Sequence, residues 1–424
     1  MKRTSRLFAL SAFLLLVVTS CSKIDGVTSN PNAAKAVIAD SVVAAVASTG
    51  RALAVGTGSG VLNIDGKVLG VKCNDVIKVK AGTYTNINIS NINSGCPITV
   101  QNDGQVQIAG SDDQMILTNV GDLLLSGAGT TGLSRGFILR DNTAHRSIII
   151  KGVTHDLTIQ NFSFKNGGDY TIYMDNSTVV YNASSAATYS SNIKLLNNDC
   201  VNTQTFFQAP GGVTNGVVTG VLKGLEVAYL NFSVSNCGNV VNVGFADDYN
   251  CHHNTINNIN TTNNTHNGIF SMSGNGQFHH NLVTNHQGNA IRAWAMSLGT
   301  TPKEVLIYNN TVVNSRKYSG FECQGFADYI VAGKTTYANC KVYNNICGNL
   351  NLSKDWVGVV VDVYNLFGGY CQVYNNKGFN FPAPYATSFI VNPESTLVPI
   401  LTNNVYYATA TAAGINVNAL TIQP

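Results

Sequence analysis

The fold is decided by a phrase that the sequence repeats, beginning with Leu157-Thr-Ile-Gln-Asn161-Phe-Ser-Phe164. The arrangement returns as Ile193-Lys-Leu-Leu-Asn197-Asn-Asp-Cys200 and as Cys340-Lys-Val-Tyr-Asn344-Asn-Ile-Cys347. Each phrase is a short apolar strand, a turn residue and a second strand. The turn positions are Asn161, Asn197, Asn231, His253, His280, Asn309, Asn344 and Asn375. Their spacing of about 22 to 36 residues is typical of a solenoid that winds one coil per repeat.

A second asparagine follows each turn position by five residues. These asparagines are Asn166, Asn202, Asn236, Asn258, Asn285, Asn314, Asn349 and Asn380. Asparagine tolerates the left-handed backbone of a tight bend, and parallel pairing places the same bend of successive coils about 4.8 Å apart. We therefore expect asparagine ladders in which each amide bonds the coils above and below. Apolar residues four and two places before the turn, and three places after it, predict the inward face.

These repeats resemble the right-handed parallel β-helix of the pectin-lyase-like superfamily over most of residues 70–410. The resemblance implies an all-β solenoid with asparagine-rich turns. It implies less about function, because the superfamily holds polysaccharide lyases, glycoside hydrolases, phage tailspikes and adhesins. We expect the coils to open with a strand and turn at 76–84, to continue at 97–100, 106–108 and 147–150, and to end in a degenerate coil at 402–407.

The beginning of the chain has the pattern of a secreted lipoprotein. A basic start precedes an apolar run over residues 7–18 that is too short to span a bilayer. Val18-Thr-Ser-Cys21 resembles the lipobox of bacterial lipoproteins, which implies that Cys21 is acylated; an ordinary signal peptide with a chance cysteine is the alternative. We expect a signal peptide at 1–20, a tether or N-terminal cap at 21–56 and the β-helix at 57–424. The expected location is extracytoplasmic, lipid-anchored in the cell envelope, at the outer membrane.

The charge balance limits the partners. The chain has 25 basic and 22 acidic residues, and removing residues 1–20 takes away three basic residues and no acidic one. A nearly neutral chain has no basic stripe for nucleic acid and no excess charge to attract a strongly anionic polymer. We expect a monomer whose partner is a weakly charged or locally recognised polysaccharide, with membrane contact only through the lipid. No cofactor is expected; calcium is suggested by the family resemblance alone, because no calcium-binding motif is present.

Cysteines are numerous for a chain expected outside the cytoplasm. Cys21 and nine others are present, and this compartment permits disulfides. Cys340 and Cys371 hold the same place in adjacent coils, so a bridge between them is geometrically possible. We favour free buried thiols for these two. Cys73 with Cys96 is a second candidate pair, which spacing does not decide.

A further apolar strand follows the loop of each coil, and its outward side chains predict the functional face. We match Val241, Ile269, Ile291, Phe321 and Val359 as inward residues. The first outward column then reads Tyr173, Asn242, Phe270, Arg292, Glu322 and Val360, and the second reads Asp175, Gly244, Met272, Trp294, Gln324 and Asp362. Aromatic rings beside amides suit sugars, whose ring faces stack on aromatics and whose hydroxyls need hydrogen bonds. The predicted substrate-binding residues are Asn242, Phe270, Trp294, Gln324, His252 and His279.

The candidate catalytic residues are Arg292, Glu322 and Asp362. Arg292 and Glu322 face each other on adjacent coils, either as an ion pair or as a catalytic pair. Glu322 and Asp362, one coil and two residues apart, would lie roughly 8 Å from each other, a separation that suits an inverting glycosidase. All five residues predicted to be outermost here, Phe270, Arg292, Trp294, Glu322 and Asp362, are expected to be exposed.

Two family patterns match only in part. Polygalacturonase-like hydrolases carry an Asp-Asp pair, present here as Asp247-Asp248, but also Gly-His-Gly and Arg-Ile-Lys motifs that are missing. Gly288-Asn-Ala-Ile-Arg292 resembles the Gly-Gly-Ile-Arg stretch of alginate-lyase and chondroitinase-B-like lyases, whose lysine partner is missing. Lyase and hydrolase chemistry both stay open, and a non-catalytic binding or adhesion protein is the alternative.

Histidine pairs recur on two adjacent coils, as His252-His253 and His279-His280. Four imidazoles together suggest a transition-metal site. However, His253 and His280 occupy turn positions, and His252 and His279 continue an outward column of tyrosines. That column includes Tyr308, Tyr343 and Tyr374. We therefore favour ring stacking and expect no metal.

Overall fold

The computed structural model describes residues 50–325, 329–382, 388–391 and 396–424. The predicted signal peptide, the predicted lipidation at Cys21 and residues 21–49 of the tether or cap predicted at 21–56 lie outside the described residues. Strand β1 begins at Ala52, earlier than the boundary expected at residue 57. Among the described residues, no helix is long and apolar enough to cross a membrane.

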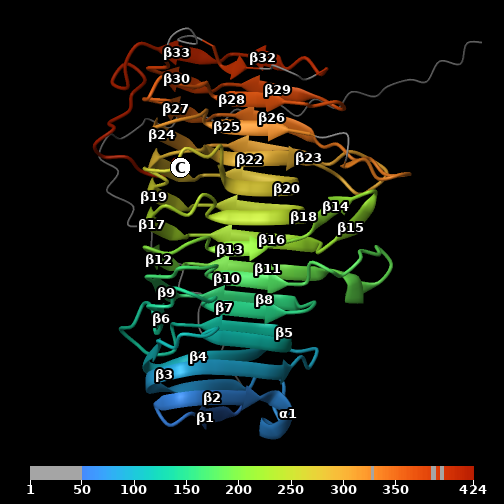
Figure 1. Ribbon diagram of the computed structural model, residues 1–424, viewed down its shortest axis with the longest axis vertical. Coiled ribbons are helices and arrows are strands. Elements are labelled where there is room, and N and C mark those ends of the chain that lie inside the picture. The colour runs from blue at the N-terminus through green and yellow to red at the C-terminus, as the bar shows by residue number, and fades with distance from the viewer. Residues whose placement is uncertain (1–49, 326–328, 383–387, 392–395) are drawn as a thin grey trace, which may run out of the picture. The chain divides into compact units, whose positions relative to one another are not determined.

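From residue 50 onward the chain forms coils that stack along one axis (Figure 1). Each coil adds strands to three faces, and strands of successive coils pair in parallel on each face. The predicted all-β parallel β-helix is thereby confirmed. A short helix, α1 (Gly66–Leu69), begins at the N-cap residue Asp65, and a 3-10 turn covers Ala186–Thr188.

Face one begins with β1 (Ala52–Val55) and the first halves of β3 (Val76–Ile92) and β4 (Ile98–Ile108). It continues with the second half of β5 (Met115–Ser126), β8 (His155–Gln160), β11 (Ser190–Leu196), β16 (Leu222–Ala228), the second halves of β18 (Val241–His252) and β20 (Gly268–His279), β23 (Glu304–Tyr308), β26 (Asn339–Tyr343), β29 (Cys371–Tyr374) and β32 (Ile400–Thr402).

Face two follows the next corner of each coil. It holds the start of β2 (Ser59–Asp65), the middle of β3, the end of β4, β6 (Phe137–Arg140), β9 (Phe162–Lys165), β12 (Asp199–Val201), β17 (Asn231–Ser235), β19 (Thr255–Ile259), β21 (Leu282–His286), β24 (Thr311–Ser315), β27 (Ile346–Gly348), β30 (Lys377–Phe379) and β33 (Val405–Tyr407). The last strands of faces one and two confirm the predicted final coil at 402–407.

Face three closes each coil. It holds the ends of β2 and β3, the first half of β5, β7 (Ile148–Lys151), β10 (Ile172–Asp175), β13 (Phe207–Ala209), the first halves of β18 and β20, β22 (Asn289–Ala295), β25 (Phe321–Gln324), β28 (Val361–Tyr364) and β31 (Ile390–Val391). An antiparallel hairpin, β14 (Gly212–Thr214) and β15 (Val217–Thr219), projects between β13 and β16.

The bends between faces one and two have the predicted left-handed backbone. Seven of the eight predicted turn positions have φ values between 51° and 61°. Asn231 is the exception, because it lies inside β17, and Tyr229 makes the turn of that coil with φ 55°. Val234 consequently takes the place predicted for Asn236. The predicted turn of this coil lies two residues too late, because tyrosine, not asparagine or histidine, stands at its bend.

The outer asparagine ladder is confirmed in two stretches. Asn202 donates to Asn166 at 3.0 Å, and farther along Asn349 donates to Asn314 at 2.9 Å. Between the two stretches a neighbouring asparagine takes the place of the predicted one: Asn285 donates to Asn257 and not to Asn258.

A second, buried ladder stands one residue after the bend, and the sequence analysis missed it. Its members are Asn254, Asn281, Asn310, Asn345, Asn376 and Asn404. Nδ2 of Asn310 donates to Asn345 at 3.0 Å and to the carbonyl of Phe278 at 2.9 Å. Its Oδ1 accepts from the backbone and side-chain N–H groups of Asn281 at 2.9 and 3.0 Å. Each amide therefore satisfies its own coil and its neighbour.

Of the two candidate cysteine pairs, one is bridged and the other is free. Cys73 and Cys96 form a disulfide. Cys340 and Cys371 are register partners on face one, but both are buried free thiols. They serve as small apolar core residues.

The histidine pairs continue the tyrosine column, as expected. Ring centroids lie 5.0 Å apart between His252 and His279, 4.7 Å between His279 and Tyr308, and 5.0 Å between Tyr308 and Tyr343. These stacked rings lie on the outer side of face one. Within the described ranges, no group of three or more His, Cys, Asp and Glu side chains is placed to hold a metal ion.

Candidate active site

Three predicted catalytic residues meet on the outer side of face three. Strand pairing places Arg292 opposite Glu322, and Glu322 opposite Asp362. The three side chains thus occupy one column on β22, β25 and β28. Asp362 faces Glu322 directly and is not displaced by two residues. The expected spacing of roughly 8 Å is therefore wrong, and the α-carbons lie about 4.8 Å apart, as in any parallel pair.

Two of the predicted outward residues point into the core instead. Phe270 and Met272 are fully buried, and Ser271 and Ser273 take their places in the outward columns. Phe270 is therefore not a substrate-binding residue. The reason is the register of β20, which sets Phe270, not Ile269, opposite Ile291. A shift of one residue exchanges the two sides of a strand.

A similar slip affected the end of the column. The inward partner of Phe321 is Val361, not Val359. Val360, predicted to face outward, is fully buried. The shift of two residues preserves the alternation, and this is why Asp362 is still found on the outer side of face three.

Glu322 is buried, contrary to the exposure expected for it. Only 3% of the residue is accessible to solvent. Its Oε2 accepts from Nε of Arg292 at 2.7 Å and lies 3.2 Å from Nε2 of His266. With its amide oriented to satisfy both neighbours, Gln324 donates to Oε1 of Glu322 at 3.2 Å and accepts from the indole N–H of Trp294 at 3.0 Å. A buried carboxylate with three donors is well satisfied.

The two carboxyl groups differ in protonation. Burial raises the pKa of Asp362 to about 6, and the negative charge of Glu322 adds to this effect against the opposing influence of His266 and Arg292. Burial also raises the pKa of Glu322, but the hydrogen bond from His266 and the charge of Arg292 outweigh it, so the pKa of Glu322 is lowered overall. Glu322 is therefore ionised at a pH where Asp362 still holds a proton.

His266, which the sequence analysis did not single out, lies over this pair. Its ring is stacked on Tyr318, with centroids 4.1 Å apart and planes 14° apart. Its Nε2 also lies 3.1 Å from Oδ1 of Asn289. Trp356 stands 6.2 Å from the same imidazole and is 52% exposed. An exposed aromatic ring beside polar side chains is typical of a recognition surface.

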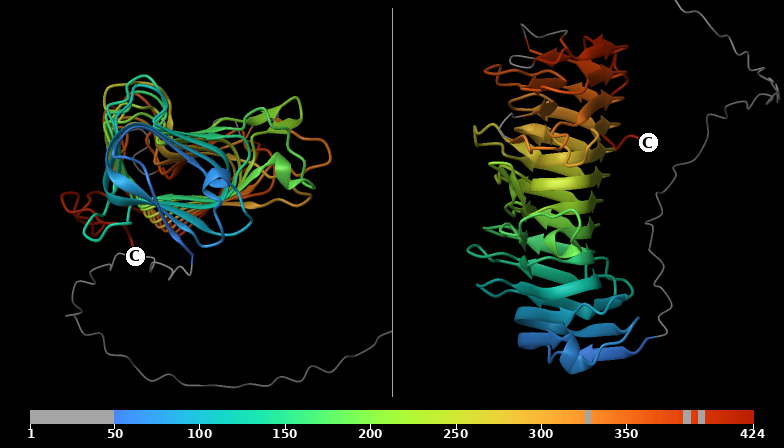
Figure 2. Two further views of the ribbon diagram at one scale, coloured as in Figure 1. Left: turned by 90° about the horizontal axis from the view of Figure 1, so that it is seen from below. Right: turned by 90° about the vertical axis from the view of Figure 1, so that its right-hand side faces the viewer.

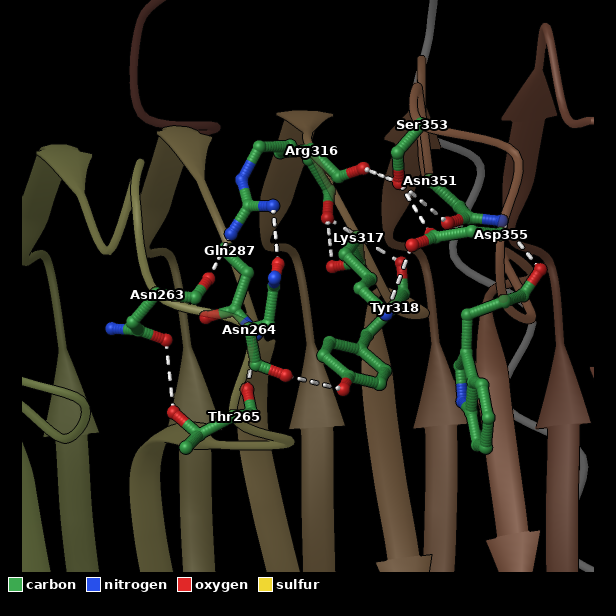
Figure 3. Close-up of polar contacts among 12 residues, drawn as sticks. Asn263, Asn264, Thr265, Gln287, Arg316, Lys317, Tyr318, Asn351, Ser353 and Asp355 are labelled. Atoms are coloured by element: carbon green, nitrogen blue, oxygen red, sulfur yellow. Dashed lines mark hydrogen bonds and ion pairs between the residues drawn. The ribbon is translucent and has the colours of Figure 1, made fainter.

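A polar network holds the loop that carries His266 (Figure 3). Arg316 reaches that loop by bonds to the carbonyl of Asn263 and to Oδ1 of Asn264, the latter at 2.9 Å. The hydroxyl of Tyr318 donates to the carbonyl of Asn264 at 3.2 Å. On the other side, Lys317 pairs with Asp355 at 3.0 Å. Three loops, before β20, before β25 and before β28, are thus tied together around the carboxyl pair.

A hollow of about 340 Å³ lies on face three, one coil away from Glu322, with Trp294 in its lining. Trp294 is partly buried at its edge, and its ring centroid lies 5.5 Å from that of Tyr329. Asn242, predicted to bind substrate, also lines the hollow and donates to Gln208 at 3.1 Å. Gln324 links Trp294 to Glu322, whereas Asn242 lies in the column of Arg292, two coils away from it.

His252 and His279 lie apart from this site. They stand at the ends of β18 and β20, after those strands have turned onto face one. His252 bonds Glu226 at 3.2 Å, and His279 bonds Asn250 at 2.9 Å. These two histidines therefore lie on a different face from Trp294, and their binding of substrate stays a prediction.

Calcium does not fit the carboxyl pair. This ion takes six to eight oxygen ligands, whereas the Glu322 oxygens face three N–H donors from Arg292, His266 and Gln324. The other acidic pair, Asp247-Asp248, lies at the bend of β18, where Asp247 bonds Lys303 at 2.6 Å.

No family profile matches the sequence, and no curated protein matches it. A family 6 polysaccharide lyase from Pseudopedobacter saltans is 11% identical, with a TM-score of 0.40, over 85% of this chain and 97% of its own. A family 28 exopolygalacturonase from Yersinia enterocolitica is 12% identical, with a TM-score of 0.33, over 83% and 72%. A mannuronic acid specific family 6 lyase from human gut microbiota is 10% identical, with a TM-score of 0.26, over 84% and 93%. Identity and TM-score are low in all three comparisons, and the parallel β-helix of this chain is established by its own strand pairing.

Proposed function

We propose that this protein hydrolyses a polysaccharide at the Glu322–Asp362 pair on the outer side of face three. The observation that carries the proposal is the direct register of two carboxyl groups on adjacent coils, with His266 against Glu322 and the exposed Trp356 near His266. A β-helix does not need charged residues at these positions. Pairs of carboxyl groups whose environments push their pKa values apart are typical of acid–base sites.

The roles of the two groups follow from their protonation. Asp362, whose pKa is raised to about 6, donates a proton to the glycosidic oxygen as the bond to the sugar breaks. Glu322, held ionised by Arg292 and His266, is the nucleophile that bonds to the sugar as the glycosidic bond breaks. Water, which gives a proton to the Asp362 carboxylate, then displaces Glu322 from the sugar and completes the hydrolysis. The short separation expected between register partners suits a retaining mechanism better than an inverting one.

Hydrolysis is favoured over elimination by the state of Arg292. A lyase requires a base that removes a proton from a uronate ring, and arginine does not lose its proton in proteins. Arg292 is also ion-paired to Glu322 at 2.7 Å, so it is not free to neutralise a uronate carboxylate. The nearly neutral chain and the paired charges of the site together suggest a neutral or weakly charged polysaccharide.

A non-catalytic binding protein is the second candidate function. The burial of Glu322 favours it, because a carboxylate with three donors also serves to fasten the His266 loop to face three. In that case Trp356 and Tyr318 bind sugar rings and no bond is cleaved.

Incubation with neutral polysaccharides (mannan, xylan, β-1,3-glucan) and with uronates (alginate, polygalacturonate) separates these functions. If the protein is a hydrolase, one of the neutral polysaccharides is expected to give new reducing ends without the absorbance of unsaturated products. Asp362→Asn is expected to lower the rate by about 10²- to 10⁴-fold, while Asp199→Asn, a matched change on face two, leaves it unchanged. Unsaturated products would identify a lyase, and binding without any new ends would identify a binding protein.

We also propose that the mature protein is anchored by lipid at Cys21. The support is the basic start, the apolar run and the lipobox-like sequence. A Cys21→Ser variant is expected to lose lipid labelling and to leave the detergent phase. Unchanged partitioning of that variant would refute the anchor.

A further inference from the structure

The hollow beside Trp294 continues the column of the carboxyl pair. Ser273 is the register partner of Trp294, and Ser271 is the partner of Arg292, which faces Glu322. At about 4.8 Å per coil, the hollow begins one coil away from Glu322. A polysaccharide lying along the column from the carboxyl pair toward β20 therefore runs into the hollow.

The β14–β15 hairpin crosses face three at the far side of the hollow. Its first glycines lie directly on the sheet: a Cβ added to Gly244 would stand 2.2 Å from the carbonyl oxygen of Gly211, and one added to Gly212 would stand 3.7 Å from the carbonyl oxygen of Gly244. Only glycine permits such an approach of two backbones. The outward column that contains Trp294 and Ser273 is thereby blocked at β18.

The hairpin is a fixed wall and not a free flap. Its underside belongs to a separate hydrophobic cluster made of Val213, Val218, Val221, Phe245, Met296 and Leu298. At its tip, a Cβ on Gly216 would stand 4.0 Å from the carbonyl oxygen of Ile330. Figure 2 shows the green hairpin and the orange loop that follows β25 projecting on the same side of the coils. Apolar burial of this kind anchors a hairpin that would be marginal by itself.

The lining of the hollow suits a sugar. Trp294 and Tyr329 supply aromatic surface, and their ring centroids are 5.5 Å apart. Asn242, Ser271 and Ser273 supply amide and hydroxyl groups. Rings that stack on sugar faces and polar groups that bond hydroxyls are the two elements of carbohydrate recognition.

We infer that the hollow receives the end of the polysaccharide chain, so that the enzyme acts from chain ends and releases short products of uniform length. This inference rests on the proposed function, and it adds the mode of action to it. A chain that passed through would need an open groove on both sides of the carboxyl pair. The hairpin wall, two coils beyond Trp294 by register, closes one side.

Tryptophan fluorescence tests the hollow without requiring catalysis. The chain has two tryptophans, so the Trp356→Phe variant reports on Trp294 alone. We titrate this variant with narrow size fractions of each polysaccharide of the panel. If the hollow takes chain ends, saturation is expected at the same molar concentration of chains whatever their length. Saturation at the same mass concentration, or no response to any polysaccharide, would overturn the inference.

Blocking the hollow provides the matched comparison. Ser273→Phe, added to Trp356→Phe, is expected to weaken the response at least tenfold, whereas Ser233→Phe on face two leaves it unchanged. Deleting residues 212–219 joins Gly211 to Gly220, whose backbones already touch. In this variant, saturation is expected at the same mass concentration of polysaccharide and no longer at the same molar concentration of chains. An unchanged response in both hollow variants, each with a normal melting temperature, would contradict the inference.

Product analysis separates the two proposals. Cleavage that yields a broad ladder of lengths from the start overturns the chain-end mode and leaves hydrolysis standing. Absence of cleavage together with saturation by chains overturns hydrolysis and leaves the chain-end site standing.

Discussion

The corner between faces one and two and the outer side of face three use polar side chains in opposite ways. At the corner, Asn310 and its equivalents bond copies of themselves in the coils above and below. On face three, Glu322 bonds three different residue types, two of them on its own face and one, His266, on a loop. The corner repeats along many coils, whereas the face-three cluster occurs at one place among the described residues.

This difference distinguishes polar residues that support the fold from polar residues that form a functional site. A polar residue that pairs with its own copies is explained by the stacking of coils, because buried polar groups must be satisfied. A polar cluster that combines unlike residues from two strands and a loop gains nothing from the repeat. Burying its charged groups costs free energy, and its two carboxyl groups have unequal pKa values. A functional site at this place accounts for both.

The largest effect is expected from breaking the face-three cluster. Glu322→Ala removes the partner of Arg292 in a buried site, and removing one member of a buried ion pair costs about 3–5 kcal/mol. Urea unfolding measures this cost. Glu304→Ala, which breaks a partly exposed pair with Lys341, serves as the control and is expected to cost less than about 1 kcal/mol. Equal costs would mean that Glu322 is an ordinary surface partner.

The corner is tested by truncating one asparagine in the middle of the buried ladder. Asn310→Ala leaves a backbone N–H and a carbonyl without partners, and we expect a loss of about 3 kcal/mol in unfolding free energy. Asn314, in the partly exposed outer ladder, also bonds both neighbours. The Asn314→Ala variant is nevertheless expected to lose only about 1 kcal/mol. A larger cost at Asn314 would reverse the assignment of the supporting ladder.

The ring column on face one predicts a smaller, pH-dependent effect. Burial, and then the charges of His252, His280 and His253, lowers the pKa of His279 to about 3. Because the unfolded chain takes up this proton near pH 6.5 and the folded chain does not, stability is full above pH 6.5 and is lost as the pH falls. His279→Tyr continues the tyrosine column and is expected to recover about 1–2 kcal/mol at pH 5. No gain on acidification would contradict the stacking account.

The smallest effect concerns recognition by the exposed aromatic surface. Trp356→Ala is expected to weaken polysaccharide binding about tenfold, or about 1.4 kcal/mol, with little change in melting temperature because the ring is half-exposed. Isothermal titration measures this difference. Val398→Ala, at another exposed apolar residue far along the chain, provides the control. A large loss of stability without loss of affinity would show that Trp356 supports the loops only.

The fold was predictable because every coil has the same physical requirements, so the same residue types recur in each repeat. The bends at Asn161, Asn309 and Asn344 each need a left-handed backbone, and the apolar positions beside them recur in step. The buried ladder also left a signal that was missed: an asparagine directly follows the bend in Asn309-Asn310, Asn344-Asn345 and Asn375-Asn376. Its fixed place one residue beyond the bend points inward, where an amide must be fully bonded.

The site was predictable only in part. Arg292, Glu322 and Trp294 were found because β22 and β25 align without a slip. The coils that carry Phe270 and Asp362 were misaligned, because loops of unequal length precede β20 and β28 and remove the register signal. His266 and Trp356 lie on such loops, and loop residues follow no period that a sequence can reveal.

The most direct test of the face-three site is the unfolding free energy of Asp362→Asn relative to the unaltered protein between pH 4 and pH 8. The folded pKa of Asp362 is raised to about 6, so the folded state holds a proton that the unfolded chain releases near pH 4. Stability of the unaltered protein therefore falls as the pH rises from about 4 to 6. The account predicts that the inactive variant is more stable at pH 8 by about 1–2 kcal/mol, and that this gain disappears at pH 4. A variant that is less stable at pH 8 would show that the Asp362 carboxylate is a stabilising partner, and would contradict its role as the proton donor.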